Sequence, residues 1–364
     1  MALSCGIVGL PMVGKTTFFN LLTNAGIETS TFYSGKTTTN INMATVPDER
    51  VEFLSRMFHP KKTTFAQIEV IDVPGLVRGS SEGKGTGNEF LAAVRDSDAL
   101  VHIVRAFENK DVLHVDNSLD LMRDLETVNM ELLFADLQLI ETRLERINSG
   151  KKKKLENPLE ETVLLKIRDV LENEQPVSTI KFSDEEREAI KHITFLTDKP
   201  MLIVVNLDEK QFTSGSYDQK EEIHTFGTEH NMIVLEICAQ VEAEISQLEP
   251  EDKQLFMEDL GVKEPGIDRL AKAIYDLLGL ISFLTAGEDE VRAWTIKKGL
   301  SAKKAAGKIH SDIERGFIRA EIVAFQDLKE AGSMAKAREH GSFRLEGKEY
   351  IVQDGDIINF RFNV

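Results

Sequence analysis

The chain has 364 residues, of which 41% are hydrophobic and 29% are charged, and its formal net charge is −17. This length is too great for one compact core, so we expect two or three domains. No apolar run reaches the roughly 18 residues that a membrane-spanning helix requires, which excludes a membrane protein and predicts a cytoplasmic one. The acidic charge argues against a protein that coats nucleic acid.

The charge is unevenly distributed along the chain. Residues 281–364 contain 14 basic and 13 acidic residues, a net of +1, so residues 1–280 carry −18. Six basic residues in the C-terminal part have no acidic residue among them: Arg292, Lys297, Lys298, Lys303, Lys304 and Lys308. This cluster either contacts the phosphates of a ribosomal or RNA partner or is a solvated helix face.

The stretch from Gly9 to Thr16 fits the phosphate-binding pattern GxxxxGK[ST]. It lies between a short apolar strand and a helix, which is the context that this motif requires. The two glycines allow a tight turn, so that backbone N–H groups point at phosphate oxygens. Lys15 would reach the β- and γ-phosphates, and the Thr16 hydroxyl would hold Mg²⁺. We predict nucleotide contacts at Gly9, Met12, Val13, Gly14, Lys15, Thr16 and Thr17.

A second phosphate-proximal motif follows a predicted strand over residues 66–73. The strand ends in Asp72-Val73-Pro74-Gly75, which places a carboxylate near Mg²⁺ and the Gly75 N–H near the γ-phosphate. The next position, where Ras-like GTPases have a water-orienting glutamine, is Leu76, which cannot hydrogen-bond to water. His114 is the nearest candidate to orient water instead, although a loop histidine without a catalytic role remains equally open.

Strands alternate with helices in the rest of the first 280 residues. Residues 99–104, 201–205 and 233–237 read as buried strands, and His102 within the first of them reads as a packed core residue. Apolar spacing predicts an antiparallel helical hairpin from Asn117 through Val170, and Ser183 begins a capping box. We therefore predict an α/β P-loop NTPase domain with a mostly parallel sheet over residues 1–280 and a helical insertion at about 118–196.

The pattern changes near Phe283. A strand over 292–297, a helix from Ser301 through Ile313, a segment 317–325 and two short strands, 349–352 and 357–362, follow. This order predicts a small β-grasp domain over residues 281–364.

The strand over 201–205 is followed by Asn206-Leu207-Asp208-Glu209, where GTPases usually have NKxD. The aspartate of that motif accepts hydrogen bonds from guanine, and the longer Glu209 would fit guanine poorly. These residues weaken the guanine interpretation but do not establish adenine.

The whole chain resembles the Obg-like ATPases of the YchF type. The resemblance rests on residues 5–17, 72–88, 105–115, 206–209, 286–295, 307–320 and 354–364. It implies an NTPase domain with a helical insertion, a C-terminal TGS domain, ATP preference with Asn206 and Leu207 at the base, and ribosome association. It also implies that the catalytic histidine is His114.

Two departures from this family pattern lie near the γ-phosphate. Relatives usually have an asparagine, associated with K⁺, where this chain has Met12, and a thioether is a poor ligand for a hard cation. Relatives place a threonine that binds Mg²⁺ and the γ-phosphate where this chain has Lys36. Two alternatives are open: Thr37 takes the place of that threonine, or Lys36 contacts the phosphate directly. We expect nucleotide binding to survive, hydrolysis to be altered and K⁺ stimulation to be in doubt.

The sequence thus predicts an ATP-hydrolysing switch that associates with ribosomes or ribosomal RNA, with a monomer favoured. Its metal ligands would be Thr16, Asp72 and Thr37, and its base contacts Asn206, Leu207 and Glu209. A nucleotide-gated binding protein with negligible turnover, or a GTPase, remains the alternative.

Overall fold

The computed structural model describes residues 3–27, 39–76, 87–149 and 158–363. The chain forms two compact units, and both are discontinuous in sequence: residues 1–43 with 69–270, and residues 44–68 with 271–364. The domain boundary at residue 280 remains a prediction. In the structure, residues 44–68 belong to the same compact unit as residues 271–364. Within the described residues no helix is long and apolar enough to cross a membrane.

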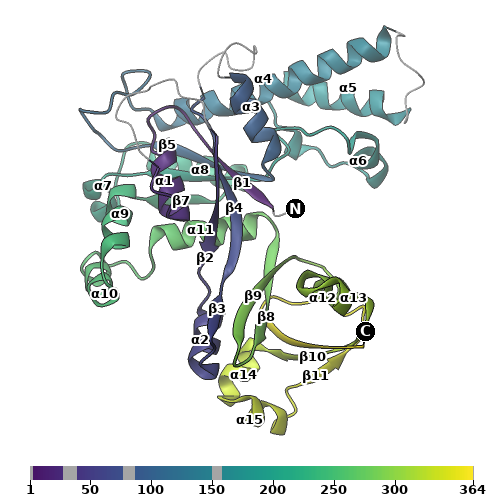
Figure 1. Ribbon diagram of the computed structural model, residues 1–364. Coiled ribbons are helices and arrows are strands. Elements are labelled where there is room, and N and C mark those ends of the chain that lie inside the picture. Colours follow the sequence, from purple (N-terminus) through teal and green to yellow (C-terminus); the bar gives the residue numbers. More distant parts are fainter. Residues whose placement is uncertain (1–2, 28–38, 77–86, 150–157, 364) are drawn as a thin grey trace. The chain divides into compact units, whose positions relative to one another are not determined.

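The first unit is built around a six-stranded sheet in the order β2-β4-β1-β5-β6-β7 (Figure 1). The pairs β1–β4, β1–β5, β5–β6 and β6–β7 are parallel. Every residue of β1, β5 and β6 is buried, as expected for strands covered on both faces. The strands are β1 (Ser4–Val8), β2 (Asn40–Val46), β4 (Ala66–Asp72), β5 (Ala99–Arg105), β6 (Met201–Asn206) and β7 (Val234–Ile237).

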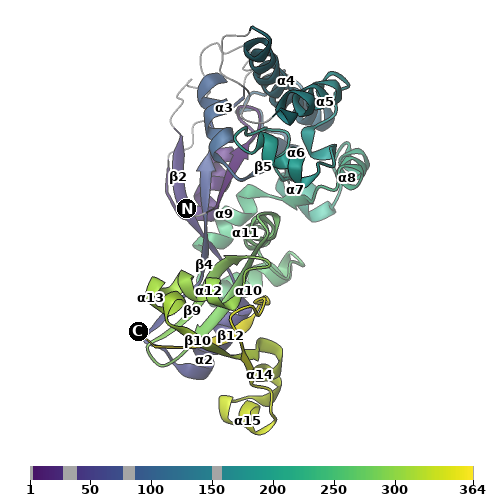
Figure 2. The same cartoon turned by 90° about the vertical axis from the view of Figure 1, so that its right-hand side faces the viewer.

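Helices flank this sheet, and α4 and α5 extend from it side by side as the predicted hairpin (Figures 1 and 2). Leucine, isoleucine and valine side chains of the two helices form their own core. The capping box at Ser183 is confirmed, but its helix ends at Ile190, before the predicted Leu196. The helices are α1 (Lys15–Thr23), α3 (Gly87–Asp96), α4 (Leu121–Asn148), α5 (Leu159–Glu172), α6 (Asp184–Ile190), α7 (Glu209–Ser214), α8 (Lys220–Glu229), α9 (Ala239–Gln247), α10 (Pro250–Asp259) and α11 (Gly266–Leu277).

The second unit contains a six-stranded sheet in the order β11-β10-β12-β8-β9-β3. Its strands are β3 (Lys62–Thr64), β8 (Leu280–Ala286), β9 (Glu290–Lys297), β10 (Phe317–Ala324), β11 (Arg344–Glu346) and β12 (Asp356–Phe362). Segment 44–68 joins this unit because β3 pairs in parallel with β9 and helix α2 (Glu49–Phe58) contacts β8 and β9. The remaining helices are α12 (Ala302–Ile309), α13 (Ser311–Arg315), α14 (Phe325–Ala331) and α15 (Met334–Glu339).

Two predictions of local structure in this unit were wrong, and two of its strands were not predicted. The helix from Ser301 to Ile313 is interrupted at His310, whose backbone is extended and whose ring accepts the Asp312 N–H to cap α13. Residues 349–352 contribute only a bridge, Ser301 to Ile351, and not a strand. Strands β8 and β11 were not predicted, because neither has a regular alternation of polar and apolar residues.

Candidate functional site

The loop between β1 and α1 has the backbone geometry that its glycines predict. Gly9 and Gly14 have φ values of 148° and 102°. A Cβ at Gly9 would lie 2.5 Å from the Ile103 carbonyl oxygen, and one at Gly14 would lie 2.6 Å from Nδ2 of Asn206. Side chains are therefore excluded at both positions. Among the described residues no side chain caps the N-terminus of α1, which suits its first N–H groups to binding an anion.

Met12 also has a positive φ of 63°. A β-carbon makes this left-handed conformation costly, and asparagine tolerates it better than other non-glycine residues. Met12 therefore combines backbone strain with a thioether that binds hard cations poorly.

Lys15 is held on its own loop. Its Nζ donates to the carbonyl oxygens of Gly9 and Leu10 at 3.1 and 2.8 Å, and the residue is 7% exposed. Burial lowers the pKa of Lys15 to about 8, partly offset by the nearby Asp72 carboxylate. Phosphate oxygens would offer Nζ of Lys15 charged acceptors in place of these two carbonyls.

Thr16 and Asp72 form the candidate Mg²⁺ site. The Thr16 hydroxyl donates to Oδ2 of Asp72 at 2.9 Å. Burial raises the pKa of Asp72, while hydrogen bonds from Thr16 and Asn40 and the charge of Lys15 oppose the rise. A hydroxyl and a carboxylate are hard oxygen ligands that suit Mg²⁺. Thr37, the third predicted ligand, and Lys36 lie outside the described residues.

Gly75 and Leu76 pack against the phosphate-binding loop. The Leu76 N–H donates to the Gly9 carbonyl at 3.2 Å, and its side chain is fully buried. A Cβ at Gly75 would lie 3.1 Å from Cγ of Pro11 and 3.3 Å from Nζ of Lys15. Residues 77–86, which include most of the predicted glycine-rich switch, lie outside the described part of the chain.

Asn206 organises the predicted base end of the site. Its Nδ2 donates to the Val13 carbonyl at 3.0 Å, and its Oδ1 accepts the Ala239 N–H at 3.3 Å. Asn206 thus ties β6 to the phosphate-binding loop and to the start of α9. Leu207 is buried in the apolar core, whereas Glu209 is exposed at the start of α7.

His114 is buried, with both ring nitrogens hydrogen-bonded. Nε2 lies 2.8 Å from Oδ2 of Asp124, and Nδ1 accepts the Asp116 N–H at 3.1 Å. The side chains of His114 and Asp124 are 4% and 1% exposed. Burial raises the pKa of Asp124, and hydrogen bonds and charge from Arg123 and His114 oppose the rise. His114 also lines a cavity of about 630 Å³.

Arg105 connects the His114 loop to the phosphate-binding loop. Its guanidinium donates to the carbonyls of Phe107 (3.1 Å), Asn109 (3.4 Å) and Val112 (2.9 Å), and to the Met12 carbonyl at 3.4 Å. The Phe107 ring packs on the guanidinium at 4.2 Å. Burial lowers the pKa of Arg105, with Asp124 opposing.

The structure therefore gathers the predicted residues Gly9, Gly14, Lys15, Thr16, Asp72, Gly75 and Asn206 around one loop. Glu209 is exposed to solvent, and His114 is hydrogen-bonded to Asp124 and Asp116. Sequence reasoning missed Asn40, Arg105 and Ala239. For Arg105 a signal existed, because it is the polar residue that ends a buried strand. Asn40 and Ala239 carry no such signal, because Asn40 reaches Asp72 from the start of β2 and Ala239 acts through its backbone N–H.

Comparisons with known proteins identify the family of the chain. Residues 4–136 match the family model described as 50S ribosome-binding GTPase. Residues 280–363 match the C-terminal model of the YchF GTPases, which is described as a protein of unknown function. A structure of a GTP-binding protein from Pyrococcus horikoshii, 20% identical with a TM-score of 0.58 and covering 99% of this chain and 100% of that chain, shares the fold.

Full-length relatives are more similar. The ribosome-binding ATPase YchF of Bacillus subtilis is 46% identical over 366 residues, and that of Haemophilus influenzae is 42% identical over 365; both alignments cover 100% of each chain. The structure of the Schizosaccharomyces pombe YchF GTPase is 32% identical with a TM-score of 0.84, covering 99% of this chain and 98% of that one. The chain therefore belongs to the YchF family.

Proposed function

We propose that the chain is a cytoplasmic ATP hydrolase whose bound nucleotide controls association with the ribosome. The observation that carries this proposal is the arrangement of Lys15, Thr16 and Asp72 at the carboxyl ends of β1 and β4. The loop between β1 and α1 excludes side chains at Gly9 and Gly14. Relatives of full length are named ribosome-binding ATPases, which supports the partner and the nucleotide.

The chemistry divides among a few residues. N–H groups of the loop and of the first turn of α1 bind the phosphates, and Lys15 turns from the Gly9 and Leu10 carbonyls to the β- and γ-phosphates. Thr16 and Asp72 would hold Mg²⁺, which neutralises developing phosphate charge. Water attacks the γ-phosphorus while its bond to the bridging oxygen breaks, giving ADP and inorganic phosphate.

His114 is the group that we propose to orient this water, since Leu76 cannot. Its ring nitrogens are hydrogen-bonded to Asp124 and Asp116, so His114 must leave at least one of them before it can act. The link through Arg105 between the His114 loop and Met12 supports coupling of that movement to the nucleotide.

ATP is favoured over GTP because this chain lacks the aspartate that reads guanine, and Glu209 points into solvent at the start of α7. Titration calorimetry with ATP and GTP, each with Mg²⁺, tests this assignment. We expect ATP to bind clearly more tightly than GTP. Tighter binding of GTP would show instead that the chain is a GTPase.

A second candidate is a nucleotide-gated binding protein with negligible turnover. The engagement of both His114 nitrogens favours it, together with Leu76. Steady-state hydrolysis with and without ribosomes separates the two functions. If the chain is an ATP hydrolase, its hydrolysis rate exceeds that of a Lys15→Ala control in at least one of the two conditions. If it is the second candidate, its rate equals that of the control in both.

A further inference from the structure

Segment 44–68 belongs to the second unit, although the residues on both sides of it in sequence belong to the first. The chain enters this segment through β2 and leaves it through β4, and the two strands are neighbours in one sheet (Figure 1). Each of these strands therefore has one end in the first unit and the other end in the second.

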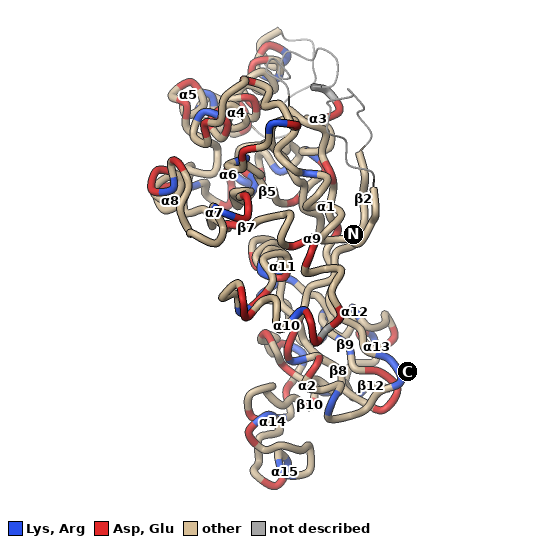
Figure 3. Tube along the Cα trace, turned by 90° about the vertical axis from the view of Figure 1, so that its left-hand side faces the viewer, with Lys and Arg blue, Asp and Glu red and all other residues tan. Residues whose placement is uncertain are grey.

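In the first unit, both strands end at the candidate Mg²⁺ site. β4 ends at Asp72, and β2 begins at Asn40, whose side chain hydrogen-bonds to the Asp72 carboxylate. Thr16 donates to the same carboxylate at 2.9 Å. β2 contains no charged residue and is tan throughout in Figure 3, so its link to Asp72 is a hydrogen bond and not an ion pair. Hydrogen-bond partners of this kind fix the orientation of a metal ligand.

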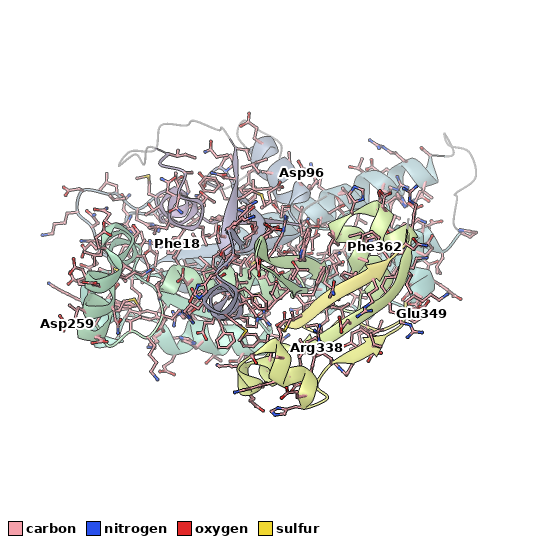
Figure 4. All side chains as sticks on the ribbon, turned by 60° about the horizontal axis from the view of Figure 1, so that its bottom comes forward. Phe18, Asp96, Asp259, Arg338, Glu349 and Phe362 are labelled. Atoms are coloured by element: carbon pink, nitrogen blue, oxygen red, sulfur yellow. The ribbon has the colours of Figure 1, made fainter. Side chains whose placement is uncertain are left out.

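In the second unit, Arg50 holds segment 44–68 directly after β2, in the first turn of α2. Its Nη1 donates to Oδ2 of Asp354 at 2.7 Å and its Nη2 to Oδ1 at 3.3 Å, while Asp48 accepts from the same guanidinium at 2.8 Å. Asp354 lies in the turn before β12, the strand that carries Phe362 in Figure 4. Its Oδ1 also accepts the Ser282 N–H of β8 at 2.9 Å. One carboxylate thus ties α2 to two strands of the second unit.

The backbone beside Asp354 is shaped to admit this guanidinium. Gly355 has a φ of 83°, and a Cβ there would lie 2.8 Å from Nη1 of Arg50. Burial would lower the pKa of Arg50, but hydrogen bonds and charges of Asp48 and Asp354 raise it overall, so the guanidinium stays charged. The other end of segment 44–68, which leads to β4, is held instead by the pairing of β3 with β9.

We propose that Arg50 and Asp354 are positioning residues for the magnesium site, because they fix the end of β2 opposite to Asn40. A strand is a rigid element, so a displacement at its Arg50 end is passed to the Asn40 amide and changes how Asp72 meets Mg²⁺. This role rests on the proposed function and adds regulation to it. The second unit sets how strongly Mg²⁺ supports nucleotide binding, and nucleotide with Mg²⁺ acts in turn on the Arg50–Asp354 contact.

The quantity that tests this role is the gain in ATP affinity that Mg²⁺ produces. Titration calorimetry of the full-length protein gives it as the Kd of ATP in EDTA divided by the Kd in saturating Mg²⁺. We expect Asn40→Ala to lower this ratio about tenfold, as for other hydrogen-bond partners of metal ligands, and to leave the Kd in EDTA unchanged. The matched control is Asn42→Ala, at an exposed asparagine of the same strand, which should change neither value.

Arg50→Gln and Asp354→Asn test the second-unit end of β2. Asparagine at position 354 keeps an oxygen for the Ser282 N–H but loses the charge that holds Arg50. Each variant should lower the ratio about threefold, a smaller effect because the two side chains are 25% and 49% exposed. The double variant should lower it no further than Arg50→Gln alone, since both exchanges remove the same contact. Glu314→Gln, which breaks an ion pair of equal length with Lys304, is the control.

An unchanged ratio in Asn40→Ala, or in both Arg50→Gln and Asp354→Asn, would overturn the positioning role. So would an equal fall in Glu314→Gln, or a rise of the Kd in EDTA as large as the rise in Mg²⁺, because either result would indicate a general disturbance of the fold. The ratio does not depend on hydrolysis, so a protein with negligible turnover gives the same test.

Failure of the proposed function has a different signature. If wild type binds neither ATP nor GTP, the proposed function and the positioning role both fail. If wild type binds nucleotide and the ratio is equal in all variants, only the positioning role fails. If GTP is the nucleotide that binds, the same ratio is measured with GTP.

Discussion

His114 and Asp124 form a buried pair in which Nε2 of the imidazole lies 2.8 Å from Oδ2 of the carboxylate. Because Nδ1 accepts the Asp116 N–H, the neutral ring carries its proton on Nε2 and donates it to Asp124. Arg123 fixes the carboxylate through two further hydrogen bonds, of 3.0 and 2.8 Å, to Oδ1. In this arrangement neither nitrogen of His114 is free to accept a proton from water.

Replacing His114 by alanine tests its catalytic role. We expect His114→Ala to lower kcat for ATP on the order of 100-fold, the usual contribution of a general base, and to leave the Kd of MgATP within about twofold. Steady-state hydrolysis with ribosomes and titration calorimetry measure the two quantities. The control is His230→Ala, which removes an exposed imidazole that stacks on Phe226. If kcat of His114→Ala equals that of wild type, His114 has a structural role and no catalytic one.

We expect the hydrogen bonds of Arg105 to stabilise the loop that carries His114. Arg105→Lys retains the charge but loses the fork that reaches the carbonyls of Met12 and Val112. We expect the free energy of unfolding to fall by about 1–3 kcal/mol, as for other buried hydrogen-bond losses, and kcat to fall several-fold. Urea denaturation and steady-state kinetics measure these changes. Exposed Arg146→Lys is the matched exchange, and an equal effect of both substitutions would contradict the expected role of Arg105.

The parallel sheet and the phosphate-binding loop could be predicted because their signals are local. Buried strands such as 99–104 and 201–205 are continuous apolar runs, and Gly9 to Thr16 is a contiguous motif. The discontinuous second unit could not be predicted, since the pairing of β3 with β9 joins Lys62 to Glu290 across more than half of the chain. No periodicity within either segment encodes that contact.

In the candidate site, too, some contacts follow from local sequence signals and others do not. Lys15, Thr16 and Asp72 meet because strand ends of a parallel sheet share one edge. The hydrogen bonding of His114 depends on Asp124, which shares the buried face of α4 with Leu121 and Val128 but which its charge alone would assign to solvent. Side-chain partners of this kind require the packed structure.

Met12→Asn tests whether the strained loop residue limits hydrolysis. Asparagine tolerates the φ of 63° better than methionine and supplies an amide oxygen that can bind a hard cation. We expect hydrolysis by the variant to be faster in KCl than in NaCl by several-fold, whereas wild type shows little difference. Met43→Asn, at an exposed methionine, is the control. Equal rates of the variant in both salts would exclude a K⁺ site at this position.

The buried carboxyl group of Asp136, on helix α4 of the helical hairpin, should make the free energy of unfolding depend on pH. Its Oδ1 accepts the Leu196 N–H, and its Oδ2 accepts the N–H and hydroxyl of Thr197. Burial nevertheless raises the pKa of Asp136 to about 6, from 3.8, because the desolvation of the carboxylate outweighs these bonds. The folded state therefore holds a proton at pH values where the unfolded state has released it.

The sign follows from this difference in bound protons. The contribution of Asp136 is fully present below pH 3.8 and is lost as pH rises through about 6. Relative to Asp136→Asn, which does not titrate, the free energy of unfolding of wild type should fall by roughly 2 kcal/mol between pH 4 and pH 7. Urea denaturation at several pH values measures it, with exposed Asp169→Asn as the control. A difference between wild type and Asp136→Asn that is constant with pH would show that the carboxylate ionises equally in both states.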